Sequence, residues 1–177
     1  MKITKVFVVA FFFFFFQAVS LFAISEENLK IAYLERFAMF IQWPTPIESY
    51  RICVYNDDAF AKMLKESYSS RLFNSHPITV TSLKIGDNQE EMTKCHILYF
   101  RGSKPNQNEI FLNTLQKHNV LIISDEGDDT RKGAMIGFYL QENKFRFVIN
   151  QRNLKNAQLN VSYKLLNFAT VIEPTGN

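Results

Sequence analysis

The stretch RICVYNDDAFAKMLKESY, residues 51–68, decides the fold. Residues 51–55 form a mostly apolar run that predicts a buried β-strand, and residues 56–58 form a polar turn. Residues 59–68 then suit a helix. A buried strand joined to a helix by a short polar turn is the unit from which parallel sheets covered by helices are built.

The same alternation continues on both sides of this unit. Upstream, Ser25 and two acidic residues favour a helix start, and the apolar residues from 29 to 43 recur at helical spacing. This helix should end at Trp43, because the residue before a proline is pushed out of the α region. Downstream, we expect helices over residues 88–94 and 108–118, and strands over residues 77–83, 96–100 and 120–123.

The last third departs from the alternation. Residues 134–140 and 144–149 are apolar runs separated by three polar residues, which predicts an antiparallel hairpin. Residues 153–158 and 161–170 look helical. We therefore expect a single α/β domain over residues 21–177, with a mostly parallel mixed sheet of about six strands, a C-terminal antiparallel hairpin, and helices on both faces.

The first twenty residues have the pattern of a cleavable signal peptide. Lys2 and Lys5 give a positive start, residues 6–16 are an unbroken apolar run, and residues 18–20 offer small side chains to a signal peptidase. We expect residues 1–20 to be a signal peptide that is removed after Ser20. The alternative is an uncleaved anchor over residues 6–24, which is just within spanning length.

The basic balance of the chain comes partly from this leader. The formal charge is +3, and loss of Lys2 and Lys5 lowers it to +1. A nearly neutral exported domain gives no electrostatic argument for nucleic-acid binding. We expect no nucleic-acid partner.

The sequence lacks the patterns that carry catalysis. It has no GxxxxGK phosphate loop and no GxGxxG motif after a strand. Residues 56–58 are similar to the acidic pocket of phosphoacceptor domains, but those domains need an aspartate at the end of the third strand, where this chain reads YFRG at residues 99–102. The histidines at 76, 96 and 118 have no partner one helical turn away, so no local metal cluster is predicted. We expect a non-enzyme without a cofactor.

The densest acidic stretch, SDEGDD at residues 124–129, has two interpretations. Several carboxylates could hold a divalent cation. However, the spacing is not that of an EF-hand loop, and Arg131 and Lys132 follow at once. We favour a solvated loop at the carboxyl edge of the sheet, an edge at which ligands of open α/β sheets also bind.

The chain has two cysteines, Cys53 in the first predicted strand and Cys95 at the start of the third. In an open parallel sheet these strands can be neighbours. Two cysteines in an exported chain favour a disulfide over the alternative of two buried free thiols. We expect a Cys53–Cys95 bridge.

Several blocks of this sequence resemble the YfiR-like periplasmic family. LKIAYLERFAMFIQWP at 29–44 is similar to the family's opening helix, and RICV at 51–54 and KCHILY at 94–99 resemble its two cysteine strands. GAMIGF at 133–138, FRFVIN at 145–150 and LLNFA at 165–169 resemble its closing blocks. The blocks follow the family's order across nearly the whole mature chain.

This resemblance implies a function. Family members include periplasmic repressors that bind the periplasmic sensor domain of a membrane diguanylate cyclase and hold down cyclic-di-GMP synthesis, and with it biofilm formation. An outer-membrane lipoprotein can sequester them. The resemblance also implies that family members form dimers. Some relatives have further cysteines in the loop before the hairpin. Residues 125–132 have none, which puts in doubt redox control through a second bridge.

Two surfaces are candidates for partner contact. The N-terminal helix is apolar on more than one face, and the second face packs either on the domain's own sheet or on a second copy; the resemblance favours a homodimer. The second candidate is the edge hairpin and its surroundings, with Phe138, Phe145, Phe147, Leu154 and Leu159.

The alternative function is a periplasmic small-ligand sensor or carrier, which would bind a metabolite at the carboxyl edge of the sheet.

Overall fold

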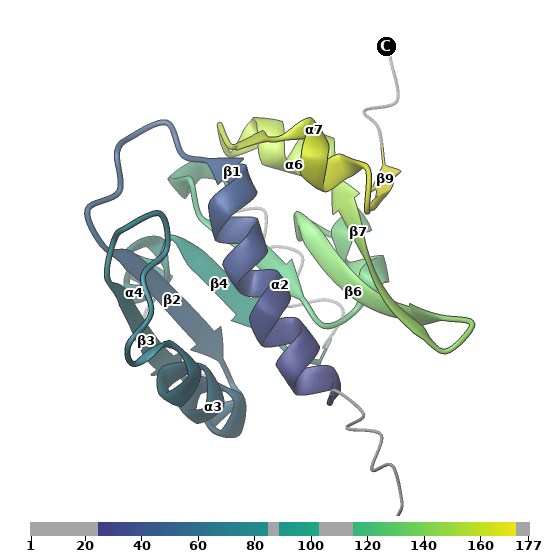
Figure 1. Cartoon of the computed structure of the whole chain (residues 1–177). Helices are drawn as coiled ribbons and strands as arrows, with labels where there is room; N and C mark the ends of the chain where they lie inside the picture. Colours follow the sequence, from purple (N-terminus) through teal and green to yellow (C-terminus); the bar gives the residue numbers. More distant parts are fainter. Residues whose placement is uncertain (1–24, 85–88, 103–114, 173–177) are drawn as a thin grey trace, which may run out of the picture.

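The computed structural model describes residues 25–84, 89–102 and 115–172. Its main sheet has seven strands in the order β3-β2-β4-β5-β6-β7-β9, and a smaller sheet pairs β1 with β8. Figure 1 shows one layered α/β domain. The expected signal peptide, and most of the helix expected over residues 108–118, lie outside the described residues.

The five neighbouring strands β3, β2, β4, β5 and β6 run parallel to one another, as predicted. Along the chain, the helix α3 (Asp58–Tyr68) connects β2 to β3, and the short helix α4 (Gln89–Thr93) precedes β4. The parallel strands are β3 (Ile78–Leu83), β2 (Tyr50–Tyr55), β4 (Ile97–Phe100), β5 (Leu121–Ser124) and β6 (Ile136–Gln141).

The antiparallel hairpin is also confirmed. β6 pairs with β7 (Lys144–Asn150), and Gln141 lies opposite Lys144, so two residues form the turn. These residues, Glu142 and Asn143, have φ values of 50° and 60°. Positive φ at both central positions is the feature of a type I′ turn, whose twist matches that of the flanking strands.

The helix expected over residues 161–170 is wrong. The helix expected over residues 153–158 is present as α6 (Gln151–Asn156). Residues 161–170 form a helix only at α7 (Tyr163–Leu166), between the strands β8 (Asn160–Val161) and β9 (Thr170–Ile172). The hydroxyl of Ser162 accepts a hydrogen bond from the Lys164 N–H and starts the helix only there. β-branched residues at both ends favour strand pairing. β9 therefore becomes a seventh strand where about six were expected.

The N-terminal helix α2 (Glu26–Phe40) begins at the predicted cap. The Ser25 hydroxyl accepts a hydrogen bond from the N–H of Asn28. The helix ends three residues before the expected boundary, because Ile41 is extended and begins β1 (Ile41–Gln42), which pairs with β8 in the small sheet. The remaining short elements are the 3₁₀ turns η1 (Gln116–His118) and η2 (Gly127–Arg131).

Helices α2 and α3 lie on the same face of the main sheet (Figure 1). The Tyr68 hydroxyl of α3 donates a hydrogen bond to the backbone oxygen of Ile31 in α2 at 2.5 Å. Phe60 of α3 packs on Tyr99 of β4 with ring centroids 4.6 Å apart. Along β2, Cys53 alternates with the residues that face α3 and therefore points to the other face, where α4 lies. Helices on both faces were predicted and are present.

The second apolar face of α2 packs on the chain's own sheet. The ring of Tyr33 lies 5.2 Å from Phe147 and 5.9 Å from Phe138 and Phe145, between centroids. Phe37, fully buried, adds contacts to Phe138 and Phe147. The intramolecular alternative thus accounts for this face, and a homodimer stays a prediction.

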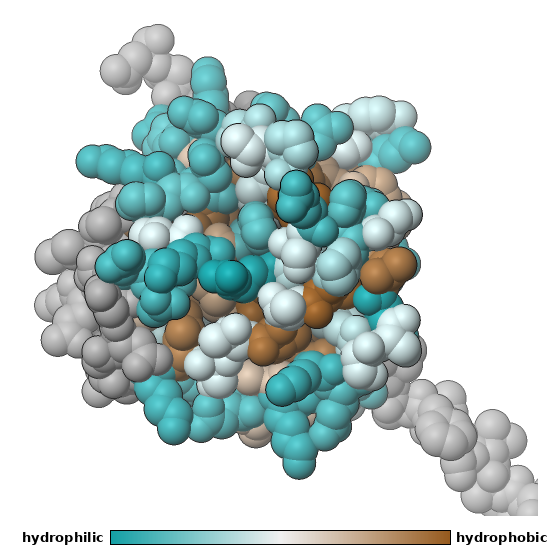
Figure 2. Space-filling view, turned by 90° about the vertical axis from the view of Figure 1, so that its left-hand side faces the viewer, coloured by the Kyte–Doolittle hydropathy of each residue, from teal (hydrophilic) through white to brown (hydrophobic). Residues whose placement is uncertain are grey.

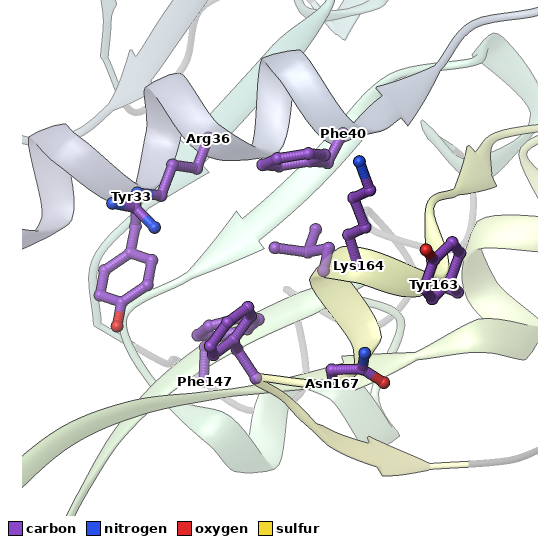
Figure 3. A pocket seen from close by; sticks show the side chains of 9 residues that line it. Tyr33, Arg36, Phe40, Phe147, Tyr163, Lys164 and Asn167 are labelled. Atoms are coloured by element: carbon purple, nitrogen blue, oxygen red, sulfur yellow. The ribbon is translucent and has the colours of Figure 1, made fainter.

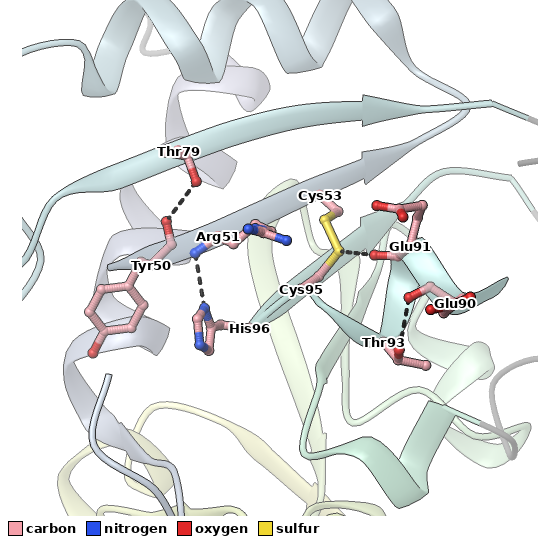
Figure 4. Close-up of a disulfide and its surroundings, with 9 residues drawn as sticks. All are labelled: Tyr50, Arg51, Cys53, Thr79, Glu90, Glu91, Thr93, Cys95 and His96. Atoms are coloured by element: carbon pink, nitrogen blue, oxygen red, sulfur yellow. Dashed lines mark hydrogen bonds between the residues drawn. A yellow bond between two sulfur atoms is a disulfide. The ribbon is translucent and has the colours of Figure 1, made fainter. Parts of the chain in front are cut away.

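A disulfide joins Cys53 in β2 to Cys95, two residues before β4, as predicted (Figure 4). The two Cα atoms are 5.9 Å apart, and both residues are at most 3% exposed. The bridge ties together two strands that already pair in register at Ile52 and Ile97. It also holds α4 on the sheet, since the Cys95 sulfur lies 3.5 Å from the backbone oxygen of Glu91.

Removing the bridge should destabilise the fold, because the unfolded chain then gains conformational freedom. The bridge closes a loop with a sequence separation of 42. For the Cys53→Ala/Cys95→Ala double variant we expect a loss of about 3–4 kcal/mol in the free energy of unfolding, measured by urea denaturation. The wild-type protein in reductant serves as the matched control and should lose a similar amount. An unchanged urea midpoint in both cases would show that the bridge contributes nothing.

Candidate binding groove between α2 and α7

The carboxyl edge of the parallel sheet, where open α/β folds bind ligands, is occupied here by paired charges. Arg101 follows β4 and forms ion pairs with three carboxylates from different elements. The nitrogen–oxygen distances are 2.6 Å to Glu27, 3.0 Å to Asp57 and 3.1 Å to Asp125. Through Asp57, Arg101 neutralises part of the acidic turn after β2.

A buried lysine completes this network. The Lys30 side chain is 1% exposed, and its ammonium group lies 2.7 Å from both Glu26 and Asp125. Burial lowers the pKa of Lys30, but hydrogen bonds to Asp125 and Glu26, together with the negative charges of Asp125 and Glu27, outweigh this and raise the pKa overall. Lys30 therefore stays charged, and the Tyr99 hydroxyl donates a further hydrogen bond to Asp125 at 2.8 Å. This part of the edge is filled by the protein's own side chains.

In the acidic stretch at residues 124–129, the carboxylate of Asp129 is buried and paired with other side chains of this segment. Asp129 is 1% exposed and accepts a hydrogen bond from the hydroxyl of Ser124. Lys132 lies 3.6 Å from the same carboxylate. Within the described residues no group of three metal-ligating side chains comes together.

His96 accepts a hydrogen bond from the Arg51 N–H at 3.0 Å. Burial, and to a smaller extent the positive charge of Arg51, lowers the pKa of His96.

An open groove lies elsewhere, between α2, β7 and α7 (Figure 3). Its volume is about 400 Å³. In Figure 3, side chains descend from α2 and face those that rise from β7 and the α7 segment. The lining residues are Tyr33, Arg36 and Phe40 of α2, Phe147 of β7, and Tyr163, Lys164, Leu165, Asn167 and Phe168 of the α7 segment.

The rim of this groove exposes large aromatic side chains. Phe168 is 74% exposed and Tyr163 is 68% exposed, whereas Phe147 and Leu165 in the floor are buried. Apolar residues scattered singly on a surface are ordinary, but two exposed aromatics beside an apolar hollow are typical of an interaction site. Aromatic residues are also enriched at the centres of protein interfaces.

Two cations stand beside these aromatics. Arg36 and Lys164 are exposed and line the groove. In the described part of the chain, neither forms an ion pair with a carboxylate. The groove therefore suits a partner segment that brings an apolar side chain together with a negative charge.

Of the five residues predicted for partner contact, one lines this groove. Phe147 forms part of its floor, and Phe145 is half-buried against Tyr33. The other three are at most 2% exposed: Phe138, Leu154 and Leu159. Contact with a partner by these five residues stays a prediction. Sequence reasoning missed Tyr163 and Phe168, because the helix expected over residues 161–170 gave no reason to place them on the surface.

Comparison with known proteins adds two findings. The model of the YfiR/HmsC-like family matches residues 27–170. Among solved structures, a conserved domain protein from Vibrio cholerae has a TM-score of 0.57 at 11% identity. The match covers 81% of this chain and 60% of that protein, so this likeness concerns the fold alone. No curated protein gave a significant match.

Truncating the buried lysine should destabilise the fold because α2 is held at its N-terminal end by this charge. Lys30→Ala removes one partner of a buried network but leaves Asp125 paired with Arg101. We expect a loss of about 3 kcal/mol in the free energy of unfolding. Lys62→Ala is the matched control, since the Lys62–Glu66 pair is exposed and 3.9 Å long. Equal urea midpoints for the two variants would contradict this role of Lys30.

Proposed function

The chain belongs to the YfiR/HmsC-like family, whose members are periplasmic regulators rather than enzymes, and on this premise we propose that it represses a membrane diguanylate cyclase. It would bind the periplasmic domain of the cyclase and so lower cyclic-di-GMP. The observation that supports this most is the groove between α2 and α7, which brings exposed aromatic rings together with two cations that form no ion pair among the described residues.

To repress an enzyme across a membrane, the regulator must bind one conformation of its membrane-spanning partner more tightly than the other. A periplasmic protein can act on a cytoplasmic reaction by favouring one conformation of a partner that spans the membrane. To move such a partner from 1:99 to 99:1, the regulator must bind the inactive conformation about 10⁴-fold more tightly, or about 5.5 kcal/mol. In the described part of the chain, no helix is long and apolar enough to cross a membrane itself.

The groove has the chemistry to supply such a difference. Burying the rings of Tyr163 and Phe168 removes apolar surface from water, at about 25 cal/mol per Å². Arg36 and Lys164 add attraction to a partner carboxylate, which speeds encounter and fixes orientation more than it adds affinity. The floor is rigid because Phe147 and Leu165 belong to the core, so the groove does not have to form on binding.

Two further elements complete the proposal. Residues 1–20 direct export as a signal peptide and are then removed, and an outer-membrane lipoprotein competes for the regulator and so relieves repression. The small-ligand alternative places a metabolite at the carboxyl edge of the sheet, where the residues that follow β5 line a hollow of about 580 Å³, within the range of pockets for small molecules. It differs in that a metabolite would bind the purified protein without any cyclase.

The export step is tested on the protein recovered from the periplasm. N-terminal sequencing should find a chain that begins at Leu21, because Ala18 and Ser20 fit the small-residue positions of a signal peptidase. A membrane-bound protein that still begins at residue 1 would support the anchor instead.

The repressor function is tested by complementation. Deleting the gene should raise cyclic-di-GMP and biofilm formation, and the exported wild-type protein should reverse both. The Tyr163→Ser/Phe168→Ser variant should fail to reverse them, because it removes the exposed rings without touching the core. Leu72→Ser is the matched control, since Leu72 is 59% exposed and does not line the groove, and it should restore repression fully.

Two possible results distinguish a wrong function from a wrong binding surface. If cyclic-di-GMP is unchanged by the deletion while the purified protein binds a metabolite, the repressor function is wrong. If the deletion raises cyclic-di-GMP but the Tyr163→Ser/Phe168→Ser variant restores repression like the wild type, the function stands and the groove is the wrong surface.

A further inference from the structure

A half-buried histidine directly before β4 supports the segment that follows α2 and β1. The ring of His96 lies 6.5 Å from that of Trp43 and 6.2 Å from that of Tyr50, between centroids, and both contacts are edge-on. Its Nδ1 atom accepts the hydrogen bond from the Arg51 N–H at 3.0 Å (Figure 4). His96 therefore links β2 to Trp43.

This hydrogen bond requires a neutral imidazole. A histidine nitrogen accepts a hydrogen bond only while it carries no proton, and both nitrogens of an imidazolium are donors. On protonation, two N–H groups would face each other, and the new charge would lie near the guanidinium group of Arg51. Trp43 and Tyr50 face the imidazole with aromatic rings. Burial and then the charge of Arg51 lower the pKa of His96, in agreement with this geometry.

Trp43 is held in place by ring contacts. Its ring lies 5.8 Å from that of Tyr50, between centroids, in addition to its contact with His96. The indole nitrogen is buried, and it has no hydrogen-bond partner in the described part of the chain. A buried donor without a partner destabilises the folded state, and contact with water would satisfy it. A hollow of about 290 Å³ beside Trp43 leaves room for the ring to move.

The segment that follows Trp43 lies at the surface. Residues 44–46 are all exposed. They belong to the connection from β1 to β2, at the left of Figure 1, and Figure 2, which faces that side, shows a mainly hydrophilic surface. The segment can therefore shift without opening the hydrophobic core.

Trp43 is also connected to the groove between α2 and α7. It directly follows β1, which pairs with β8 over two residues. Ser162 comes directly after β8, donates its N–H to the backbone oxygen of Phe40 at 2.9 Å, and caps α7 through its hydroxyl. Because a two-residue ladder carries few hydrogen bonds, the place of α7 depends on how firmly β1 is held at Trp43.

We propose that the contact of His96 with Arg51 and Trp43 is a proton-operated latch, which opens in acid, releases Trp43 and loosens the β1–β8 pairing beside the groove. Where it concerns a cyclase, this inference rests on the proposed function: acidity outside the cell would weaken the groove and relieve repression. A periplasmic protein meets the pH of the surroundings, and histidine changes its charge between about pH 5 and 8. Protonation of histidine is a known way to switch an interface.

The lowered pKa of His96 determines the direction of the effect. The latched imidazole takes up a proton only below its ordinary range, whereas the released imidazole does so with an ordinary pKa of about 6.5. The latch is therefore closed above about pH 6.5 and opens as the pH falls from there toward the lowered pKa. At about pH 5, roughly 1.5 pH units lower, the ratio of released to latched molecules rises by at most about 30-fold.

The release of Trp43 is measured on the purified mature protein, because Trp43 is its single tryptophan. Between about pH 7.5 and about pH 5, the wild-type emission should shift to longer wavelength and acrylamide should quench it more strongly. His96→Asn should show neither change, since the amide oxygen accepts the Arg51 hydrogen bond and does not titrate. His76→Asn is the matched control, because His76 lines the hollow beside Trp43 from another segment, and it should behave like the wild type.

The effect on the groove is measured by hydrogen exchange over residues 160–166. At about pH 5, these amides should exchange faster in the wild type than in His96→Asn, by at most about 30-fold, and at about pH 7.5 the two proteins should agree. Comparing the two proteins at one pH cancels the pH dependence of the exchange chemistry itself.

Four results would overturn the latch. These are a wild-type emission that does not change with pH, a His96→Asn variant that shifts like the wild type, a shift that is lost in His76→Asn, or equal exchange over residues 160–166 at about pH 5. The wild-type emission needs no variant, so this part of the test does not depend on whether His96→Asn folds. None of the measurements contains a cyclase, so their failure is distinct from a failure of the repressor function.

Discussion

The ammonium group of Lys30, buried between Asp125 and Glu26, fixes α2 on the sheet. Removing a charge from water costs several kcal/mol, and this cost is offset only where the opposite charges are held in place. Here they are, because Arg101 binds Asp125 together with Glu27 and Asp57. The network links the ends of β2, β4 and β5 to the first turn of α2, so the helix has one position along the sheet.

The groove is a consequence of that position. With its N-terminal end held, α2 packs Tyr33 and Phe37 on the aromatic residues of the β6–β7 hairpin and turns Arg36 and Phe40 toward α7. The two-residue pairing of β1 with β8 then holds the segment that leads into α7 against the C-terminal end of the helix. The same residues that stabilise the fold thus build a preformed surface with an apolar floor and a cationic rim. A regulator that acts by binding benefits from such a surface, since little ordering is needed on contact.

Much of the fold could be predicted from the sequence because the signals were local. The βα unit at residues 51–68, the hairpin, and the capping serine each depend on neighbouring residues, and all are present. The Cys53–Cys95 bridge could be predicted because two cysteines in an exported chain favour pairing and their two strands can be neighbours in a parallel sheet. The segment at residues 161–170 was predicted wrongly because its apolar residues fit a helical pattern, whereas pairing with Ile41 and with β7 determines its structure.

The candidate site was harder to predict than the fold. The C-terminal third was expected to contact a partner, but four of its five named residues are at most 2% exposed, while Tyr163 and Phe168 carry the exposed rings. Which aromatic residue is buried depends on how α2, β7 and α7 come together, and these elements are far apart in the sequence. The charge network was missed for the same reason, since Lys30, Arg101 and Asp125 meet only in the folded chain.

The central claim is that the groove contacts the periplasmic part of a diguanylate cyclase. The most direct measurement places a photo-crosslinking amino acid at Phe168 in cells, with the same amino acid at the exposed Leu72 as control, and identifies the adduct by mass spectrometry. The account predicts that position 168 captures the periplasmic segment of a membrane protein that also has a diguanylate cyclase domain, and that position 72 does not. Equal labelling from both positions, or capture at position 168 of a protein without a cyclase domain, would contradict it.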